Sequence, residues 1–211
     1  MSSVAVVGPP GSGKSTFCFN FAKHMQKHGL ATSIANANYF CRHITYKPDY
    51  DVRNSKHVRK AYRKYGDAWP KFYMSMFEAM AKDQKLSALR EKTLLFLDFS
   101  VPLEYLLLFR AQTKAFYSLS DKVVLLSGEN FRTHAGDSAI RAVSKLMESV
   151  SGRQVTPVFN RPGLEKPETA RQATLIEMIL SGGSERPDGI LDINAVEWLG
   201  FKALAQELRL V

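Results

Sequence analysis

Short apolar runs alternate with longer segments of helical periodicity along most of the chain. The first run, residues 4–7, ends at Gly8, and a helical pattern begins at Gly13. Five later runs follow the same scheme, each before a helix-sized segment: "ATSIAN", "TLLFLDF", "KVVLLSG", "VTPVFN" and "ILDIN". This alternation predicts an α/β protein, a three-layer sandwich whose mostly parallel sheet is covered by helices on both faces.

The longest departure from this alternation covers roughly residues 47–92. There "YKPDYDVRN" leads into two helical patterns before the next strand, which predicts a helical insertion after the second strand. In open parallel sheets, ligands bind beyond the carboxyl ends of the strands. The insertion is therefore expected across or beside the ligand-binding edge of the sheet.

The composition fits one domain of ordinary size. Of the 211 residues, 45% are hydrophobic and 23% are charged, so the chain can bury one substantial core and we expect a single domain over residues 1–211. No apolar run is long enough to span a bilayer, and no basic start or cleavage site precedes the first strand. These features predict a cytoplasmic protein without membrane association.

The turn after the first strand carries the clearest chemistry. Its sequence "GPPGSGKST" fills every constrained position of G-x-x-x-x-G-K-[ST], the phosphate-binding loop of nucleotide-binding proteins. In this pattern glycines let backbone N–H groups converge on a phosphate, Lys14 reaches the outer phosphates and Ser15 contacts Mg²⁺. A plain glycine-rich strand-to-helix turn is the alternative. The predicted phosphate-binding residues are Gly8, Pro10, Gly11, Ser12, Gly13, Lys14, Ser15 and Thr16.

The chain is strongly basic, with a formal net charge of +9. The clearest concentration of charge is "SKHVRKAYRKYG"; in a helix, its cations at 56, 59, 60, 63 and 64 would share one side, opposite Val58 and Ala61. Such a basic stripe over residues 56–64 could bind an anionic partner, for example RNA, an acidic protein or a nucleotide. A solvated helix face is the alternative interpretation.

The motifs together resemble those of the GPN-loop GTPases, a homodimeric P-loop family of archaea and eukaryotes. "GPPGSGKSTFC" is similar to the phosphate loop of that family, "YKPDYDVR" to its segment after the second strand, and "KYGDAWPKFYMSMFEAM" to the spacing of its Gly-Pro-Asn segment. The resemblance runs from the first strand almost to the end of the chain. It implies a P-loop fold that binds a nucleoside triphosphate with Mg²⁺, forms a homodimer and takes part with a protein partner in complex assembly.

Two departures from the family lie in the first half of the chain. Ala68-Trp69-Pro70 replaces the Gly-Pro-Asn motif itself. Asn36-Ala37-Asn38-Tyr39 replaces the family's Asn-Leu-Asp-Pro run, so that Asn38 stands where a carboxylate lies near the γ-phosphate. The resemblance therefore implies a loss of catalytic groups in this region.

Two further departures concern the switch and base-recognition motifs. Asp98-Phe99-Ser100-Val101-Pro102 replaces Asp-Thr-Pro-Gly-Gln, so only Asp98 is retained as a candidate Mg²⁺ ligand beside Ser15. A turn or helix-cap role is the other interpretation of Asp98. Asn160-Arg161-Pro162-Gly163 replaces Asn-Lys-x-Asp, which leaves Asn160 and Arg161 as candidates for base binding.

These losses predict a purine nucleotide-binding protein with degraded base recognition and weak or no GTPase activity. Gly163 has no side chain to accept hydrogen bonds from guanine, so ATP and GTP are both candidate ligands. Loss of groups that stabilise phosphoryl transfer commonly costs about 10³- to 10⁵-fold in rate.

Two other functions stay open. The first is an active ATP or GTP hydrolase that uses other catalytic residues, for which Asp49, Asp51 and Glu104 are candidates. The second is a small-molecule or nucleotide kinase, which would need a lid with paired arginines; only "FRTHAGDSAIR", with Arg132 and Arg141, offers such a pair.

Overall fold

The computed structural model describes residues 2–41, 44–108, 110–160, 191–193, 198 and 200–211. Seven strands form one sheet in the order β3-β2-β4-β1-β5-β6-β7, and every pairing described between them is parallel. The strands are β1 (Ser3–Val7), β2 (Thr32–Asn36), β3 (Tyr50–Asp51), β4 (Leu94–Asp98), β5 (Lys122–Gly128), β6 (Val155–Asn160) and β7 (Leu191–Ile193). All six apolar runs of the sequence form strands of this sheet.

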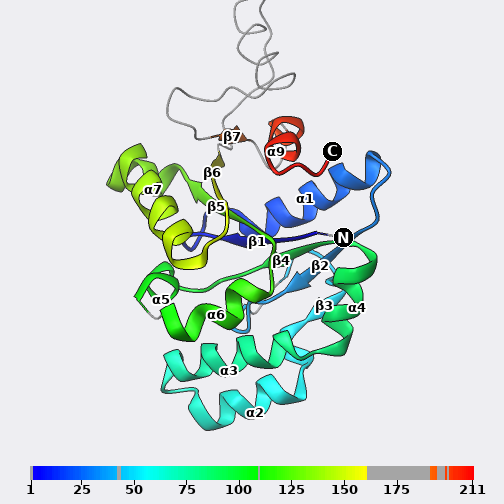
Figure 1. Ribbon diagram of the computed structural model, residues 1–211, viewed down its shortest axis with the longest axis vertical. Helices are drawn as coiled ribbons and strands as arrows, with labels where there is room; N and C mark the ends of the chain where they lie inside the picture. The colour runs from blue at the N-terminus through cyan, green and yellow to red at the C-terminus, as the bar shows by residue number, and fades with distance from the viewer. Residues whose placement is uncertain (1, 42–43, 109, 161–190, 194–197, 199) are drawn as a thin grey trace, which may run out of the picture.

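Helices cover both faces of the sheet (Figure 1). Helices α1 (Lys14–Lys27) and α9 (Phe201–Glu207) lie on one face. The other face carries α5 (Leu103–Leu108), α6 (Arg110–Ser118), α7 (Glu129–Ser151) and the helices that follow β3. The α/β three-layer fold with a parallel sheet is thus confirmed.

The two hydrophobic clusters follow the alternation of side chains along β1. Val4 and Val6 point into the cluster beneath α1, whereas Ala5 and Val7 point into the cluster beneath α3 and α6. All four side chains are completely buried. A central strand with both faces covered must be apolar at every position, which is why "VAVV" shows no polar alternation.

The segment between β2 and β4 confirms the helical insertion and extends it. It contains β3, the short 3₁₀ helix η1 (Val52–Asn54) and three α-helices, α2 (Lys56–Tyr65), α3 (Trp69–Ala81) and α4 (Gln84–Lys92). The sequence pattern predicted two helices here; the third, α4, starts separately because the Asp83 carboxylate accepts hydrogen bonds from the backbone N–H groups of Lys85 and Leu86. The two-residue strand β3 extends the sheet edge beside β2.

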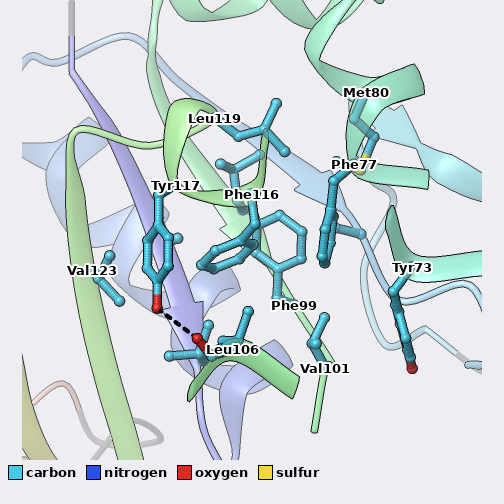
Figure 2. Packing of buried hydrophobic residues seen from close by; sticks show 14 of the residues in the cluster. Tyr73, Phe77, Met80, Phe99, Val101, Leu106, Phe116, Tyr117, Leu119 and Val123 are labelled. Carbon is cyan, nitrogen blue, oxygen red and sulfur yellow. Dashed lines mark hydrogen bonds between the residues drawn. The ribbon is translucent and has the colours of Figure 1, made fainter. Parts of the chain in front are cut away.

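Aromatic side chains fix the chain that leaves β4 (Figure 2). Phe99 is fully buried and packs edge-on against Phe116 of α6, with ring centroids 4.7 Å apart, while Phe77 of α3 lies 5.3 Å from the same ring. Such pairs add about 0.5–1.5 kcal/mol beyond area burial. The residue before Phe99, Asp98, is therefore held at the carboxyl end of β4.

No helix among the described residues is long and apolar enough to cross a membrane.

Candidate functional site

The glycine-rich loop joins β1 to α1 in a conformation that requires glycine at two close contacts. Gly8 has a φ of 153°, and a Cβ atom there would lie 1.9 Å from the carbonyl oxygen of Leu126 in β5. Gly13 has a φ of 87°, and a Cβ atom there would lie 2.4 Å from Nδ2 of Asn160 in β6. The backbone contact at Gly8 excludes a larger side chain, and the left-handed φ at Gly13 disfavours one. The loop is thus packed against the carboxyl ends of two neighbouring strands.

Lys14, the first residue of α1, turns its side chain back over the loop. Its Nζ donates hydrogen bonds to the carbonyl oxygens of Gly8, at 2.9 Å, and Pro9, at 2.7 Å. Burial lowers the pKa of Lys14, and the nearby negative charge of Asp98 acts in the opposite direction. The ammonium therefore lies at the mouth of the loop, next to the first turn of α1, where outer phosphates bind in such loops.

Asn160 and Ser12 tie the loop to the sheet. The side-chain amide of Asn160 donates to the carbonyl oxygen of Ser12 at 3.1 Å. Ser12 is buried, and its Oγ finds no hydrogen-bond partner among the described residues. An orphaned hydroxyl inside the loop is one polar group to which a ligand oxygen could bind. Of the two candidate base-binding residues, Asn160 thus contacts the loop, and Arg161 lies outside the described residues.

Asp98 is buried at the end of β4, beside both β1 and β2. Its Oδ2 accepts a hydrogen bond of 2.8 Å from the hydroxyl of Tyr46, whose ring stacks on Phe19 of α1. Burial and the Asp98 charge together raise the pKa of Tyr46 far above its usual range, so the hydroxyl remains the donor. Helix α5 begins only at Leu103, so Asp98 does not cap it. No local pattern pointed to Tyr46 as a functional residue, because its partner is 52 positions away in the sequence.

Ser15 and Asp98, the Mg²⁺ ligands expected from the sequence, both provide oxygen donors. Ser15 follows Lys14 in the first turn of α1, and Lys14 interacts electrostatically with Asp98. A hydroxyl and a buried carboxylate are the oxygen donors that Mg²⁺ prefers, and such sites take most remaining ligands from phosphates and water. Within the described part of the chain, no group of three or more His, Cys, Asp and Glu side chains could hold a metal ion by itself. The donor set therefore fits an ion brought in with a nucleotide.

The two candidate carboxylates of the insertion accept hydrogen bonds at the edge of the sheet. Asp49 accepts a hydrogen bond of 2.8 Å from the backbone N–H of Ile34 in β2. Asp51 forms an ion pair of 2.6 Å with Arg53 and accepts from the side chain of Asn36 at 3.0 Å. Burial would raise the pKa of Asp51, but the hydrogen bonds from Arg53 and Asn36 outweigh it and lower that pKa. The structure does not bring these two carboxylates to the loop by any contact, and Glu104 lies in α5.

A cavity of about 470 Å³ opens beside the loop. Its walls come from the start of the loop, from the segments that follow β2 and β4, and from α3: Gly8, Pro9, Pro10, Asn38, Phe40, Tyr73, Ser100, Val101, Pro102 and Leu103. The cavity thus lies at the carboxyl ends of the strands, where the sequence predicted a ligand site. It also meets Gly8 and Pro9, whose carbonyl oxygens bind the Lys14 ammonium.

The part of the chain that matches a known family spans the loop and most of the insertion. Residues 6–91 match a family described as a conserved hypothetical ATP-binding protein. A crystal structure of a GTPase from Pyrococcus abyssi in its apo form superposes with a TM-score of 0.71 at 19% identity, covering 99% of this chain and 96% of that one. Over residues 6–91 the chain is thus similar to an ATP-binding family, and over nearly its whole length it shares the fold of that GTPase.

More distant structures share the same fold. Thymidylate kinase from Ehrlichia chaffeensis has a TM-score of 0.51 at 9% identity, over 98% of both chains. Cobyrinic acid a,c-diamide synthase from Mycobacterium smegmatis, solved with an ATP analogue and magnesium, has a TM-score of 0.50 at 13% identity, over 98% of this chain and 92% of that one. No curated protein matches the chain. The comparisons thus support a nucleotide-binding fold of the GTPase and kinase type.

The residues that stand where the resemblance expects Gly-Pro-Asn begin α3. Ala68 precedes the helix, and Trp69 and Pro70 form its first turn. The Trp69 ring is 41% exposed and lies 5.7 Å from the ring of Tyr105 and 6.1 Å from that of Tyr73. A half-exposed tryptophan at a helix start is thus the arrangement found where the family motif is missing.

Proposed function

We propose that the chain binds a purine nucleoside triphosphate together with Mg²⁺, with little preference between adenine and guanine, and hydrolyses it weakly or not at all. The observation that carries this proposal is the shape of the loop with the Lys14 ammonium at its mouth, 2.7 Å from the carbonyl oxygen of Pro9. Loop N–H groups and this ammonium can bind the phosphates without any contribution from the lost family motifs.

Ser15 and Asp98 would hold the metal ion in this proposal. Mg²⁺ would neutralise phosphate charge and orient the outer phosphate groups. Asp98 serves through its buried carboxylate, and the Tyr46 hydroxyl positions that carboxylate through its 2.8 Å hydrogen bond. Lys14 supplies a fixed positive charge.

We expect weak hydrolysis because of the residues that follow β4. Val101 occupies the position of the family's glycine, yet its side chain is buried in the core. Pro102, at the glutamine position, has no group that could orient a water molecule. The N–H of Phe99 already donates to the carbonyl oxygen of Val6. Together with the engagement of Asp49 and Asp51 at the sheet edge, this leaves the described site without an evident general base.

The test is calorimetric titration with slowly hydrolysed analogues of ATP and GTP, with and without Mg²⁺. We expect similar affinities for the two analogues and complete loss of binding in Lys14→Ala, because the variant removes the only lysine of the loop. The matched control is Lys23→Ala on the same helix, whose ammonium lies over the Phe19 ring instead. Equal affinity of Lys14→Ala and the unchanged protein would refute the phosphate-loop assignment.

Phosphate release from natural ATP and GTP on the same sample separates the proposal from an active hydrolase. Rapid release that depends on Lys14 would show that this chain hydrolyses nucleotide with residues other than those of the family. Release below about 0.1 per hour under saturating nucleotide, more than tenfold slower than the roughly 3–5 × 10⁻⁴ per second of an unassisted small GTPase, would support the proposal.

A small-molecule or nucleotide kinase is the second candidate, and one observation favours it. The 470 Å³ cavity touches Gly8 and Pro9, which also bind the Lys14 ammonium, so a phosphoryl acceptor seated there would lie next to the outer phosphate. Nucleotide consumption that starts only when a hydroxylated acceptor is added would favour this function over the first.

Our proposals on assembly and cellular location rest on the resemblance to the GPN-loop GTPases. We propose that the chain forms a homodimer, acts with a protein partner in complex assembly and works in the cytoplasm. The dimer is checked by light scattering with and without nucleotide.

A further inference from the structure

Helix α2 presents a continuous cationic face to solvent. Its sequence contains no acidic residue, and Val58 and Ala61 are buried against the rest of the insertion. Five exposed cations occupy the opposite side: Lys56, Arg59, Lys60, Arg63 and Lys64. At about 100° per residue they fill an arc of roughly 140°. None of the ion pairs formed among the described residues involves these five side chains.

Exposed aromatic rings border this arc. Tyr62 of α2 packs against Tyr39 at 4.9 Å and against Phe40 at 5.8 Å, and Phe40 rests on the fully buried Phe72 of α3 at 5.5 Å. Phe40 is 49% exposed and Tyr62 is 40% exposed. The rings are therefore held from beneath while part of each remains open to solvent.

The cations and the rings lie side by side. Burial raises the pKa of Tyr39, whereas the positive charges of Arg59 and Arg63 act to lower it. On the helix, Arg59 and Tyr62 are three positions apart and thus neighbours on the surface. We call the set Tyr39, Phe40, Arg59, Tyr62 and Arg63 the aromatic–arginine patch.

We infer that the aromatic–arginine patch and the lysines beside it bind single-stranded nucleic acid. Phosphates pair with the cations, and unpaired bases stack on the exposed parts of Phe40 and Tyr62, which border the cationic face. A duplex keeps its bases stacked inside and could use only the charges. A merely solvated cationic face would not need two exposed aromatic rings at its border. The inference goes beyond nucleotide binding and does not involve Lys14.

The test measures fluorescence anisotropy of a labelled single-stranded RNA of about 20 nucleotides over a series of salt concentrations. We expect log affinity to fall linearly with log salt, with a slope of about −2 to −3.5 for three to five phosphate contacts. Arg59→Glu combined with Arg63→Glu should weaken binding by at least about tenfold. The matched control, Arg141→Glu with Lys145→Glu on the exposed side of α7, changes net charge equally and should have about twofold effect or less.

Stacking is tested separately from charge. Tyr62→Ala should weaken RNA binding by about 5- to 150-fold, the equivalent of one lost base–ring contact, with little change in the salt slope. Leu146→Ala, which trims an exposed apolar side chain of α7 that is 48% exposed, should leave binding unchanged. Circular dichroism and retained affinity for the nucleotide analogues would show that the variants are folded.

Four results would overturn the inference. They are equal binding of a duplex of the same sequence, equal competition by polyglutamate, equal weakening by the α7 charge reversal, and absence of binding at low salt. Equal competition by polyglutamate would assign the face to an acidic protein instead. None of these outcomes bears on the phosphate loop, so nucleotide binding can hold or fail independently.

Discussion

The hydrogen bond between Tyr46 and Asp98 allows the most direct check of the proposed metal site. Tyr46→Phe removes one oxygen atom and leaves the ring, with its stacking on Phe19, in place. Asp98 is 3% exposed and Tyr46 is 8% exposed, so water cannot readily replace the lost donor. The substitution thus leaves a buried carboxylate with one hydrogen bond fewer.

The expected loss of stability can be estimated from this geometry. A buried hydrogen bond to a charged group contributes about 1.5–3 kcal/mol, and the 2.8 Å distance places this one in the strong range. For a chain of this length, a loss of that size lowers Tm by about 3–12 °C. Because the hydroxyl also orients the proposed Mg²⁺ ligand, we expect the affinity for Mg²⁺ in the nucleotide complex to fall by about 10- to 100-fold.

Urea unfolding measures the loss of stability, and calorimetry with the ATP analogue at varied Mg²⁺ concentrations measures the change in Mg²⁺ affinity. The matched control is Tyr117→Phe, since Tyr117 is also buried but its hydroxyl makes only a 3.5 Å contact with the carbonyl oxygen of Leu106 (Figure 2). We expect the control to cost less than about 1 kcal/mol and to leave the Mg²⁺ dependence unchanged.

Equal, small losses of stability in the two Tyr→Phe variants would refute a strong hydrogen bond between Tyr46 and Asp98. A stability loss in Tyr46→Phe with unchanged Mg²⁺ affinity would keep the hydrogen bond and reject Asp98 as the metal ligand. A double-mutant cycle with Asp98→Asn measures the coupling directly, and we expect about 1.5–3 kcal/mol.

Two further predictions concern the loop and the sheet edge. Gly8→Ala should lower the free energy of unfolding, measured by urea denaturation, by more than about 2 kcal/mol, because the added Cβ would lie 1.9 Å from a backbone oxygen of β5. A loss below about 1 kcal/mol, the size expected for a surface substitution, would contradict the described packing. In the folded protein the pKa of Asp51 lies below its ordinary value of 3.8. The ionised carboxylate therefore contributes its full stabilisation of the fold above about pH 3.8, and this contribution declines as the pH falls through the lowered, folded-state pKa. The unchanged protein should therefore exceed Asp51→Asn by about 1–2 kcal/mol at pH 6, with the difference shrinking below about pH 4; a difference independent of pH would contradict the ion pair with Arg53.

Local patterns in the sequence predicted the strands and the phosphate loop well. Glycine at 8 and 13 and the Lys14-Ser15 pair are each constrained by nearby backbone geometry, so their spacing alone indicates the turn. The buried strands β1 and β2 were likewise readable as apolar runs.

The contacts that complete the site could not be predicted in this way. Tyr46 reaches Asp98 across 52 positions, and Asn160 reaches Ser12 across 148, and neither pairing leaves a periodic trace in the sequence. The two-residue strand β3 is too short to show alternation. Asp49 and Asp51 were interpreted as candidate catalytic groups because carboxylates near a site are common, but only the fold shows that both are occupied in hydrogen bonds at the sheet edge.

The two hydrogen bonds of Lys14 also bear on how fast a ligand binds. Because its ammonium already links the carbonyl oxygens of Gly8 and Pro9, the loop is held in shape by its own side chain. A preformed turn has little conformational entropy left to lose when a phosphate arrives. Nucleotide association is then a single encounter whose observed rate rises in proportion to concentration, with no plateau set by a slow ordering of the loop.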